Sequence, residues 1–288
     1  MDALRLANSA FAVDLFKQLC EKEPTGNVLF SPLCLSTSLS LAQVGAKGDT
    51  ASEIGQVLHF ENVKDVPFGF QTVTSDVNKL SSFYSLKLIK RLYVDKSLNP
   101  STTDTKPVPM MNLEATFCLG HIDDINCKII ELPFQNKHLS MLILLPKDVE
   151  DESTGLEKVE KQLNSETLLQ WTNPSTMANA KVKLSIPKFK VEKMIDPKAS
   201  LENLGLKTVF NENSSDFSGM SETKGVALSN VIHRVCLEIT EDGGDSIEVP
   251  GSRILQHKDE FHADHPFLYI IRHNKTRNII FFGKFCSP

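Results

Sequence analysis

Long hydrophobic runs are absent from this sequence. No uninterrupted apolar stretch approaches the ~20 residues that a membrane-spanning helix requires. Acidic Asp2 and Asp14 also stand among the short apolar groups of the N-terminus. We therefore expect no transmembrane span and no cleaved signal peptide. The expected location is the cytoplasm, and secretion without a cleaved signal is the alternative.

Closely paired cysteines are also absent. The six cysteines are spread along the chain and form no Cys-x-x-Cys pair. This spacing predicts neither a zinc site nor a dense disulfide framework. We expect mostly free, buried thiols, because cysteine is among the most frequently buried residue types. No metal and no cofactor is predicted.

An excess of positive charge is missing as well. The formal net charge is −5 and the pI is near 5.9. Nucleic acid is therefore an unfavourable partner, because phosphate binding depends on a concentrated positive surface. The basic set Lys87, Lys90 and Arg91 alternates with leucines. This alternation favours the solvent face of a half-buried strand over a polyanion site. A protein partner is expected instead.

The signatures of common enzymes are not found. The sequence contains no G-x-S-x-G, P-loop, G-x-G-x-x-G or H-E-x-x-H motif. His262, Asp264 and His265 could belong to a metal pair or a catalytic triad, but no third ligand or nucleophile accompanies them. A turn before a buried strand is the favoured interpretation. Cys34 and the serines that follow it are interpreted as small residues that allow close helix packing. We expect no enzyme.

What the chain does contain is an ordered series of helical and strand patterns. Its 288 residues are 41% hydrophobic, which is enough for a substantial core, and no repeat or linker divides them. Helices are predicted at residues 3–20, from Ser31 to 46, at 51–58 with a Thr50/Glu53 capping box, at 156–163 and at 197–206. Strands are predicted at residues 127–134, 139–146, 182–191, 225–240, 267–273 and 278–285, and a helix followed by a strand is predicted between 76 and 98. Helices first and strands later favour an α+β fold.

Two long segments carry a family resemblance. NVLFSPLCLSTSLSLAQVGAKGDTASEIGQVLHF resembles the N-terminal signature of serpins, and FHADHPFLYIIRHNKTRNIIFFGKFCSP resembles their C-terminal signature. Further segments between them, such as LSNVIHRVCLEITEDGG, follow in the family's order. The resemblance implies one serpin domain over residues 1–288, with mixed β-sheets, N-terminal helices and an exposed reactive-centre loop. The branch that it resembles is the ovalbumin type.

One part of the family pattern is missing. The segment SLNPSTTDTKP joins two regions between which serpins carry two helices, an edge strand and a central strand of their large sheet. We place this internal deletion near residues 97–105. A sheet without its central strand is expected to expose unpaired edges and apolar surface, both of which favour aggregation.

The resemblance also assigns a role to EDGGDSIEVPGSR. It implies a reactive-centre loop at about residues 241–260, with Arg253 and Ile254 flanking the bond that a target protease would cut. The hinge residues implied are Glu241, Gly243, Gly244, Ser246, Glu248 and Pro250. An inhibitory serpin inserts its cut loop into the large sheet as a new strand. Here Glu248 would bring an unpaired carboxylate into that sheet, and Pro250 would remove a ladder hydrogen bond.

The expected function follows from this loop. We expect a non-inhibitory, monomeric protein whose exposed loop binds a protein partner. The resemblance implies epithelial roles in adhesion and in restraining growth and invasion. One alternative is an inhibitor of a trypsin-like serine protease with Arg253–Ile254 as its reactive bond, and another is a truncated isoform without function. Asn213 and Asn274 are formal glycosylation sites that matter only on the secretory route.

Overall fold

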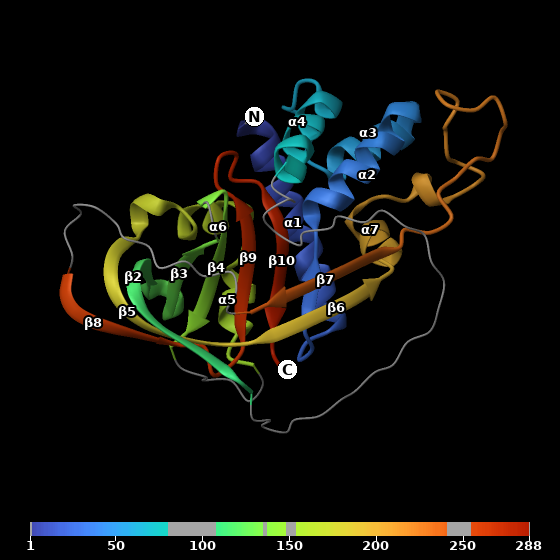
Figure 1. Cartoon of the computed structure of the whole chain (residues 1–288). Helices are drawn as coiled ribbons and strands as arrows, with labels where there is room; N and C mark the ends of the chain where they lie inside the picture. The colour runs from blue at the N-terminus through green and yellow to red at the C-terminus, as the bar shows by residue number, and fades with distance from the viewer. Residues whose placement is uncertain (1, 80–107, 135–136, 148–153, 241–254, 288) are drawn as a thin grey trace.

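The computed structural model describes residues 2–79, 108–134, 137–147, 154–240 and 255–287. Its helices are α1 (Asp2–Lys22), α2 (Pro32–Gly45), α3 (Gly48–Val57), α4 (Val66–Lys79), α5 (Glu157–Gln162), α6 (Ser165–Trp171) and α7 (Lys198–Leu204). Its strands are β1 (Val28–Phe30), β2 (Met110–Ile122), β3 (Cys127–Pro133), β4 (Leu139–Pro146), β5 (Ala178–Pro187), β6 (Phe189–Ile195), β7 (His233–Ile239), β8 (Leu255–His262), β9 (Phe267–His273) and β10 (Ile279–Phe285). Helices dominate the first part and strands the rest, as expected of the α+β class (Figure 1).

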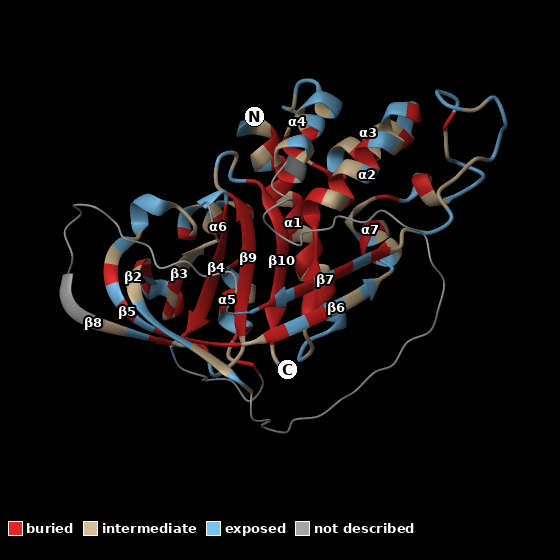
Figure 2. Ribbon diagram, viewed as in Figure 1, coloured by how far each residue is buried: buried red, intermediate tan, exposed pale blue. Residues whose placement is uncertain are grey.

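Eight strands form one large sheet in the order β1-β10-β9-β4-β3-β2-β5-β8. Neighbouring strands are antiparallel except β5 and β8, which are parallel. Every residue of β4, β9 and β10 is buried, as is typical of strands that are covered on both faces. Figure 2 shows this central region as continuous buried structure.

The two faces of the central strands are covered by different layers. On one face, α1 packs against β10, and the rings of Phe16 and Phe282 stack with centroids 4.3 Å apart. On the other face, the two-stranded sheet of β6 and β7 crosses the large sheet (Figure 1). Phe189 of β6 lies 4.6 Å from the ring of Phe285. The side chains of Phe282 and Phe285 point to opposite faces of the large sheet, because side chains alternate along a strand.

Helix α2 begins as the sequence predicts. Ser31 is its N-cap, its hydroxyl accepts a hydrogen bond from the Cys34 amide at 3.3 Å, and Pro32 is the first helical residue. This arrangement supplies a partner for one of the amides that the first turn of a helix leaves free.

The capping box predicted for the next helix is wrong. Helix α3 begins at Gly48, two residues before Thr50, so both predicted capping residues lie inside the helix. The Thr50 hydroxyl accepts from the Asp216 amide at 2.9 Å, and Glu53 accepts from the Lys207 and Thr208 amides at 2.9 and 2.8 Å. The pair therefore anchors a distant loop to α3, and local spacing alone could not distinguish this role from a cap.

Two predicted strands differ from the structure. The run 182–191 contributes to β5 and β6, which belong to different sheets and are separated at Lys188. In the run 225–240 only His233–Ile239 forms a strand. The strand expected at residues 86–95, with Lys87, Lys90 and Arg91, lies outside the described residues, as do residues 97–105.

All six cysteines lie in the described ranges and are thiols outside disulfide bonds. Cys20 and Cys127 are buried, Cys236 is exposed, and the other three are partly buried. The expectation of free thiols is confirmed, whereas burial holds fully for only two of them. Burial raises the pKa of the Cys127 thiol to about 12, so this thiol is unreactive at neutral pH.

Candidate functional site

The strands that flank the predicted loop belong to different sheets. β7 precedes the loop and pairs with β6, whereas β8 follows it and pairs with β5. Because β8 begins at Leu255, residues 255–260 belong to a strand and not to the loop that was predicted to reach 260. The reactive-bond and hinge residues lie outside the described residues: Glu241, Gly243, Gly244, Ser246, Glu248, Pro250, Arg253 and Ile254.

The strand that leads into the loop has one partner in the described part of the chain. β7 pairs with β6 along its whole length, from His233 opposite Ile195 to Ile239 opposite Phe189. Within the described ranges, no strand pairs with the other edge of β7. An open edge presents unpaired amides and carbonyls and can accept a further strand.

Side chains of β7 alternate between a buried and an exposed face. Val235, Leu237 and Ile239 are buried. On the exposed face, Arg234 donates through Nε to Glu192 at 3.0 Å, and this guanidinium lowers the pKa of the Glu192 carboxyl. The pair joins β6 to β7 across the exposed surface. Such exposed pairs contribute little to stability, so the buried face holds this small sheet in place.

A buried histidine fixes the start of β7. The Ser31 amide donates to His233 Nε2 at 2.9 Å, and the Ser31 hydroxyl donates to the Ile280 carbonyl at 2.6 Å. Burial lowers the pKa of His233 to about 4. The ring is therefore neutral at neutral pH, and this hydrogen-bonded cluster joins α2, β7 and β10 behind the strand that leads to the loop.

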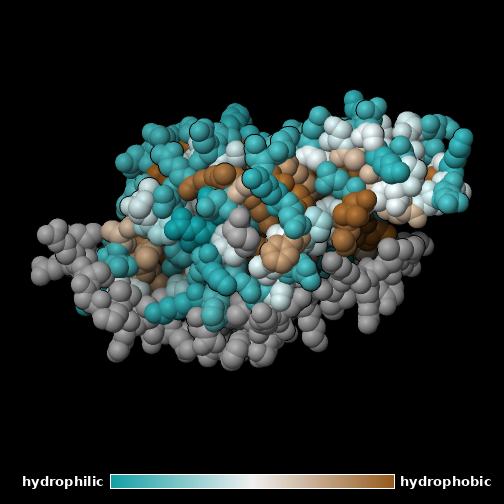
Figure 3. Space-filling view, turned by 90° about the horizontal axis from the view of Figure 1, so that it is seen from above, coloured by the Kyte–Doolittle hydropathy of each residue, from teal (hydrophilic) through white to brown (hydrophobic). Residues whose placement is uncertain are grey.

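Apolar side chains are exposed on the helices beyond this small sheet. Leu41 and Val44 of α2 are 60% and 66% exposed, and Phe68 of α4 is 65% exposed. A groove of about 580 Å³ runs between these helices and includes Leu41 and Phe70. Hydrophobic patches are visible among hydrophilic surface in Figure 3. In the described part of the chain, α2 and α4 therefore expose apolar surface.

The histidine-rich turn makes structural contacts. His265 Nε2 lies 2.7 Å from the Pro146 carbonyl, and its Nδ1 lies 2.8 Å from Asp264. His262 lies 3.5 Å from Glu260. Over the described ranges, no group of three or more His, Cys, Asp or Glu side chains could hold a metal ion. The turn ahead of β9 is thus fastened to the end of β4, as the favoured interpretation predicted.

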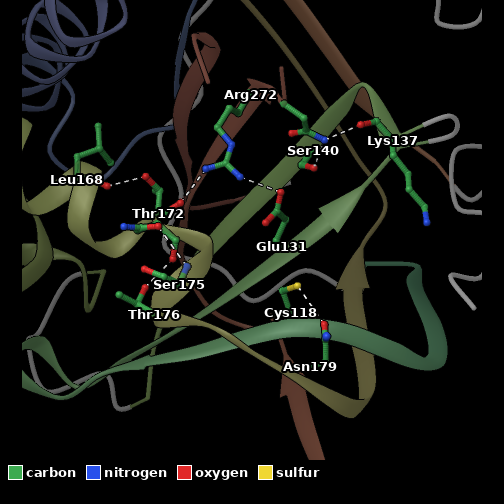
Figure 4. A network of polar contacts seen from close by, with 12 residues as sticks. Cys118, Glu131, Lys137, Ser140, Leu168, Thr172, Ser175, Thr176, Asn179 and Arg272 are labelled. Carbon is green, nitrogen blue, oxygen red and sulfur yellow. Dashed lines mark hydrogen bonds and ion pairs between the residues drawn. The ribbon is translucent and has the colours of Figure 1, made fainter. Parts of the chain in front are cut away.

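A buried ion pair joins β9 to β3. Arg272 donates through Nη2 to Glu131 of β3 at 2.8 Å and through Nη1 to the Thr172 carbonyl at 2.7 Å (Figure 4). The side chains of Arg272 and Glu131 are 7% and 13% exposed. Burial lowers the pKa of the Arg272 guanidinium, and the Glu131 carboxylate opposes that effect. No sequence pattern predicts this pair, because its members are 141 positions apart.

The two glycosylation sequons have different environments. Asn213 is exposed, whereas Asn274 Nδ2 donates to the Lys137 carbonyl and the Ser140 hydroxyl, each at 2.8 Å. A glycan on Asn274 would replace one of these donors, so chains modified there should fold poorly. We expect the chain, when secreted through an added signal peptide, to carry a glycan on Asn213 and not on Asn274.

Mass spectrometry of peptides from the secreted protein checks this expectation. Asn213→Gln should remove the glycan, and Asn274→Gln should leave the glycan pattern unchanged. A glycan on Asn274 in folded, secreted protein would contradict it.

None of the helices in the described segments is long and apolar enough to cross a membrane.

Comparison with known proteins places these features in one family. Residues 6–103 and 100–288 match the family model described as Serpin (serine protease inhibitor). Serpin B5 of Mus musculus and Serpin B5 of Homo sapiens are each 70% identical over 375 residues, with all of this chain and all of each relative covered. Those alignments are longer than the 288 residues of this chain, so the relatives contain residues that have no counterpart here.

Solved structures give the same result. A crystal structure of maspin superposes with a TM-score of 0.92 at 69% identity and covers 100% of this chain and 99% of that chain. A structure described as a tumour suppressing serpin has a TM-score of 0.89 at 67% identity, with both chains fully covered. Uncleaved ovalbumin, at 22% identity and a TM-score of 0.83, shares the fold. The chain therefore belongs to the serpin family.

Proposed function

We propose that this chain is a serpin without protease-inhibitory activity that acts by binding a protein partner through the exposed loop centred on Arg253. The similarity to Serpin B5 and to a structure described as a tumour suppressing serpin supports this proposal. Epithelial adhesion and restraint of growth and invasion belong to the same proposal. It assigns the chain no catalytic activity, a monomeric state, and the cytoplasm as its location, with secretion as the alternative.

The observation that carries the proposal is the sheet next to the loop. Insertion of a cut loop as a central strand needs a strand on each side. In the described residues, the sheet that leads into the loop consists of β6 and β7 alone. We infer that the internal deletion near residues 97–105 removed the strand on the far side, and the two pieces of the family match meet at residues 100–103.

The chemistry of the loop adds a second obstacle. Glu248 and Pro250 occupy positions where inhibitory serpins carry small residues. A buried, unpaired carboxylate costs several kcal/mol, and proline leaves a gap in the hydrogen-bond ladder. Both the loop and the sheet that would accept it are therefore unsuited to insertion.

Incubation with trypsin tests this part of the proposal. We expect cleavage after Arg253 and no SDS-resistant complex, because a loop that does not insert releases the protease. Arg253→Ala should abolish cleavage at this bond. The double variant Glu248→Ala/Pro250→Ala should still form no complex, since it restores the loop but not the sheet. A covalent complex with the unchanged chain would overturn the proposal in favour of the inhibitor alternative.

The binding role of the loop needs a separate measurement. Arg253 is exposed in the proposal, and arginine is enriched at interaction hot spots. We expect Arg253→Ala to reduce the recovery of specific partners from epithelial lysate. Arg234→Ala is the matched control, because Arg234 is an exposed arginine on β7 outside the loop. Equal recovery by both variants would exclude Arg253 as a docking residue.

The remaining alternative, a truncated isoform without function, concerns stability. The central strands are buried on both faces, so we expect one cooperative thermal transition in circular dichroism. A broad slope with aggregation would favour the non-functional alternative, because the apolar groove between α2 and α4 would then dominate the behaviour of the chain.

A further inference from the structure

A long loop precedes β7 and is separate from the predicted reactive-centre loop. It covers residues 211–232, between the 3₁₀ turn Thr208–Phe210 and β7, and is the longest described segment without helix or strand. Figure 1 shows it as an orange loop that projects away from the sheets. Loops longer than about 15 residues are uncommon in compact domains, and many of them have a function of their own. We call this segment the 211–232 loop.

Both arms of the 211–232 loop are fastened to the body of the protein. In the first arm, the Gly219 amide donates to the Gly45 carbonyl at the end of α2, at 3.1 Å. In the second arm, the Leu228 amide donates to the Val209 carbonyl at 2.9 Å. These contacts fix the two ends of the loop and leave a short stretch between them.

The tip between the two arms, residues 222–225, is exposed and weakly held. All four of its residues are exposed. In the described part of the chain, its one backbone hydrogen bond runs from the Thr223 amide to Ser221 Oγ at 3.2 Å, within the loop itself. Exposed backbone with few hydrogen bonds opens at a low cost in free energy. Loop tips of this kind are preferred sites of proteolytic nicking.

The tip contains a bond that a trypsin-like protease can recognise. Lys224 is exposed and forms no ion pair with the residues that the structure describes, so its ammonium group can enter an acidic specificity pocket. Gly225 follows it in a left-handed conformation, with φ of 78°. Glycine changes from left-handed to extended backbone without a steric penalty. The tip can therefore take up the extended conformation that a protease binds without displacing either arm.

Lys207 provides a contrast in the same region. Its side chain is also exposed, but its amide donates to Glu53 Oε2 at 2.9 Å and to the Gly205 carbonyl at 3.0 Å. The next amide, that of Thr208, donates to the same carboxylate at 2.8 Å. A protease could bind this stretch in an extended conformation only after these hydrogen bonds had broken. Backbone hydrogen bonding, and not side-chain exposure, therefore distinguishes the two lysines.

A cut at the tip would leave the fold assembled. The residues after it form β7, β8, β9 and β10, and β9 and β10 lie between β1 and β4 in the large sheet. Every residue of β9 and β10 is buried, so the two pieces cannot separate without exposing the core. Because β7 and β8 both lie after the cut, the segment between them keeps the strands on either side of it.

We propose that Lys224–Gly225 is a processing site for a serine protease with an acidic specificity pocket, and that the cut gives a folded two-chain form. Water adds across the peptide bond, which leaves a carboxylate on Lys224 and an amino group on Gly225. The two pieces are residues 1–224 and 225–288. The site is separate from Arg253–Ile254 and does not depend on whether the chain inhibits proteases.

A lysine-specific endoproteinase is the probe, because it does not cut after Arg253. We expect limited digestion of the full native chain to form the 225–288 fragment at least about tenfold faster than the 208–288 fragment, as measured by mass spectrometry. Lys224→Gln should lower the rate of cleavage after residue 224 by about tenfold or more, whereas Lys207→Gln, the matched control, should leave it unchanged. In urea, cleavage after the two lysines should proceed at similar rates, because the difference belongs to the folded chain.

Size-exclusion chromatography tests the two-chain form. The 225–288 fragment should elute with the rest of the nicked chain under native conditions and separate from it in urea. The proposal is overturned if the native chain is cut after Lys224 no faster than after Lys207, if Lys224→Gln does not slow that cut, or if the pieces separate without denaturant. Trypsin cleavage after Arg253 is measured independently, so the two proposals can fail separately.

Discussion

Glu131→Ala is expected to lower the free energy of unfolding by about 3–5 kcal/mol. The substitution leaves the Arg272 guanidinium buried without its anion, although the hydrogen bond to the Thr172 carbonyl remains. Much of the expected loss is the desolvation of that stranded charge and not the strength of the pair itself. Urea denaturation at neutral pH measures the change, with the slope of the transition as a check that unfolding stays two-state.

Two further variants make this result interpretable. Glu192→Ala removes a carboxylate from an exposed pair with Arg234 and should change the midpoint little. Replacement of both members of the buried pair, Glu131→Leu with Arg272→Met, should recover much of the loss, because apolar groups of similar volume can replace a buried pair. If Glu131→Ala were no more damaging than Glu192→Ala, the pair would have to be hydrated in solution.

The parts of the fold that sequence predicts well are those where one local pattern decides the structure. The runs at 267–273 and 278–285 agree with β9 and β10 to within one residue, because continuous apolar runs bounded by turns are typical of fully buried strands. The Ser31 cap was also predictable, since it depends on neighbours in sequence. By contrast, the split at Lys188 between β5 and β6 depends on which sheet each half joins. No local property of the run indicates which sheet each half joins.

The candidate site also contains some features that the sequence predicts and others that depend on tertiary packing. The loop residues around Arg253 were identified from the order of family motifs, which is a property of the sequence. The Arg272–Glu131 pair depends on contacts between β3, β9 and the segment after α6. Arg272 follows five buried apolar residues of β9 and could as well mark the exposed end of a strand. Its burial follows from packing, and the sequence pattern does not encode it.

His233 gives the fold a sensitivity to acid. Its pKa is lowered to about 4 by burial, whereas an unfolded histidine titrates near 6.5. Between these pH values the unfolded chain binds more protons than the folded chain, so stability must fall as pH falls through this window. His59 behaves in the opposite sense, because its hydrogen bond with Asp14 raises its pKa. The contribution of protonated His59 to the free energy of unfolding is present in acid. It is lost as the pH rises through the pKa that His59 has in the folded chain.

His233→Gln is therefore expected to reduce the acid sensitivity of the chain. Glutamine can still accept from the Ser31 amide but does not titrate. The gap in unfolding free energy between variant and unchanged chain should shift in favour of the variant by up to ~3 kcal/mol as pH falls from neutrality to about 4. Urea denaturation over this pH range measures it, and His59→Gln is the control that should shift weakly the other way. A constant gap would mean that the protonated ring is accommodated at the start of β7, and that acid does not loosen the attachment of this strand to α2.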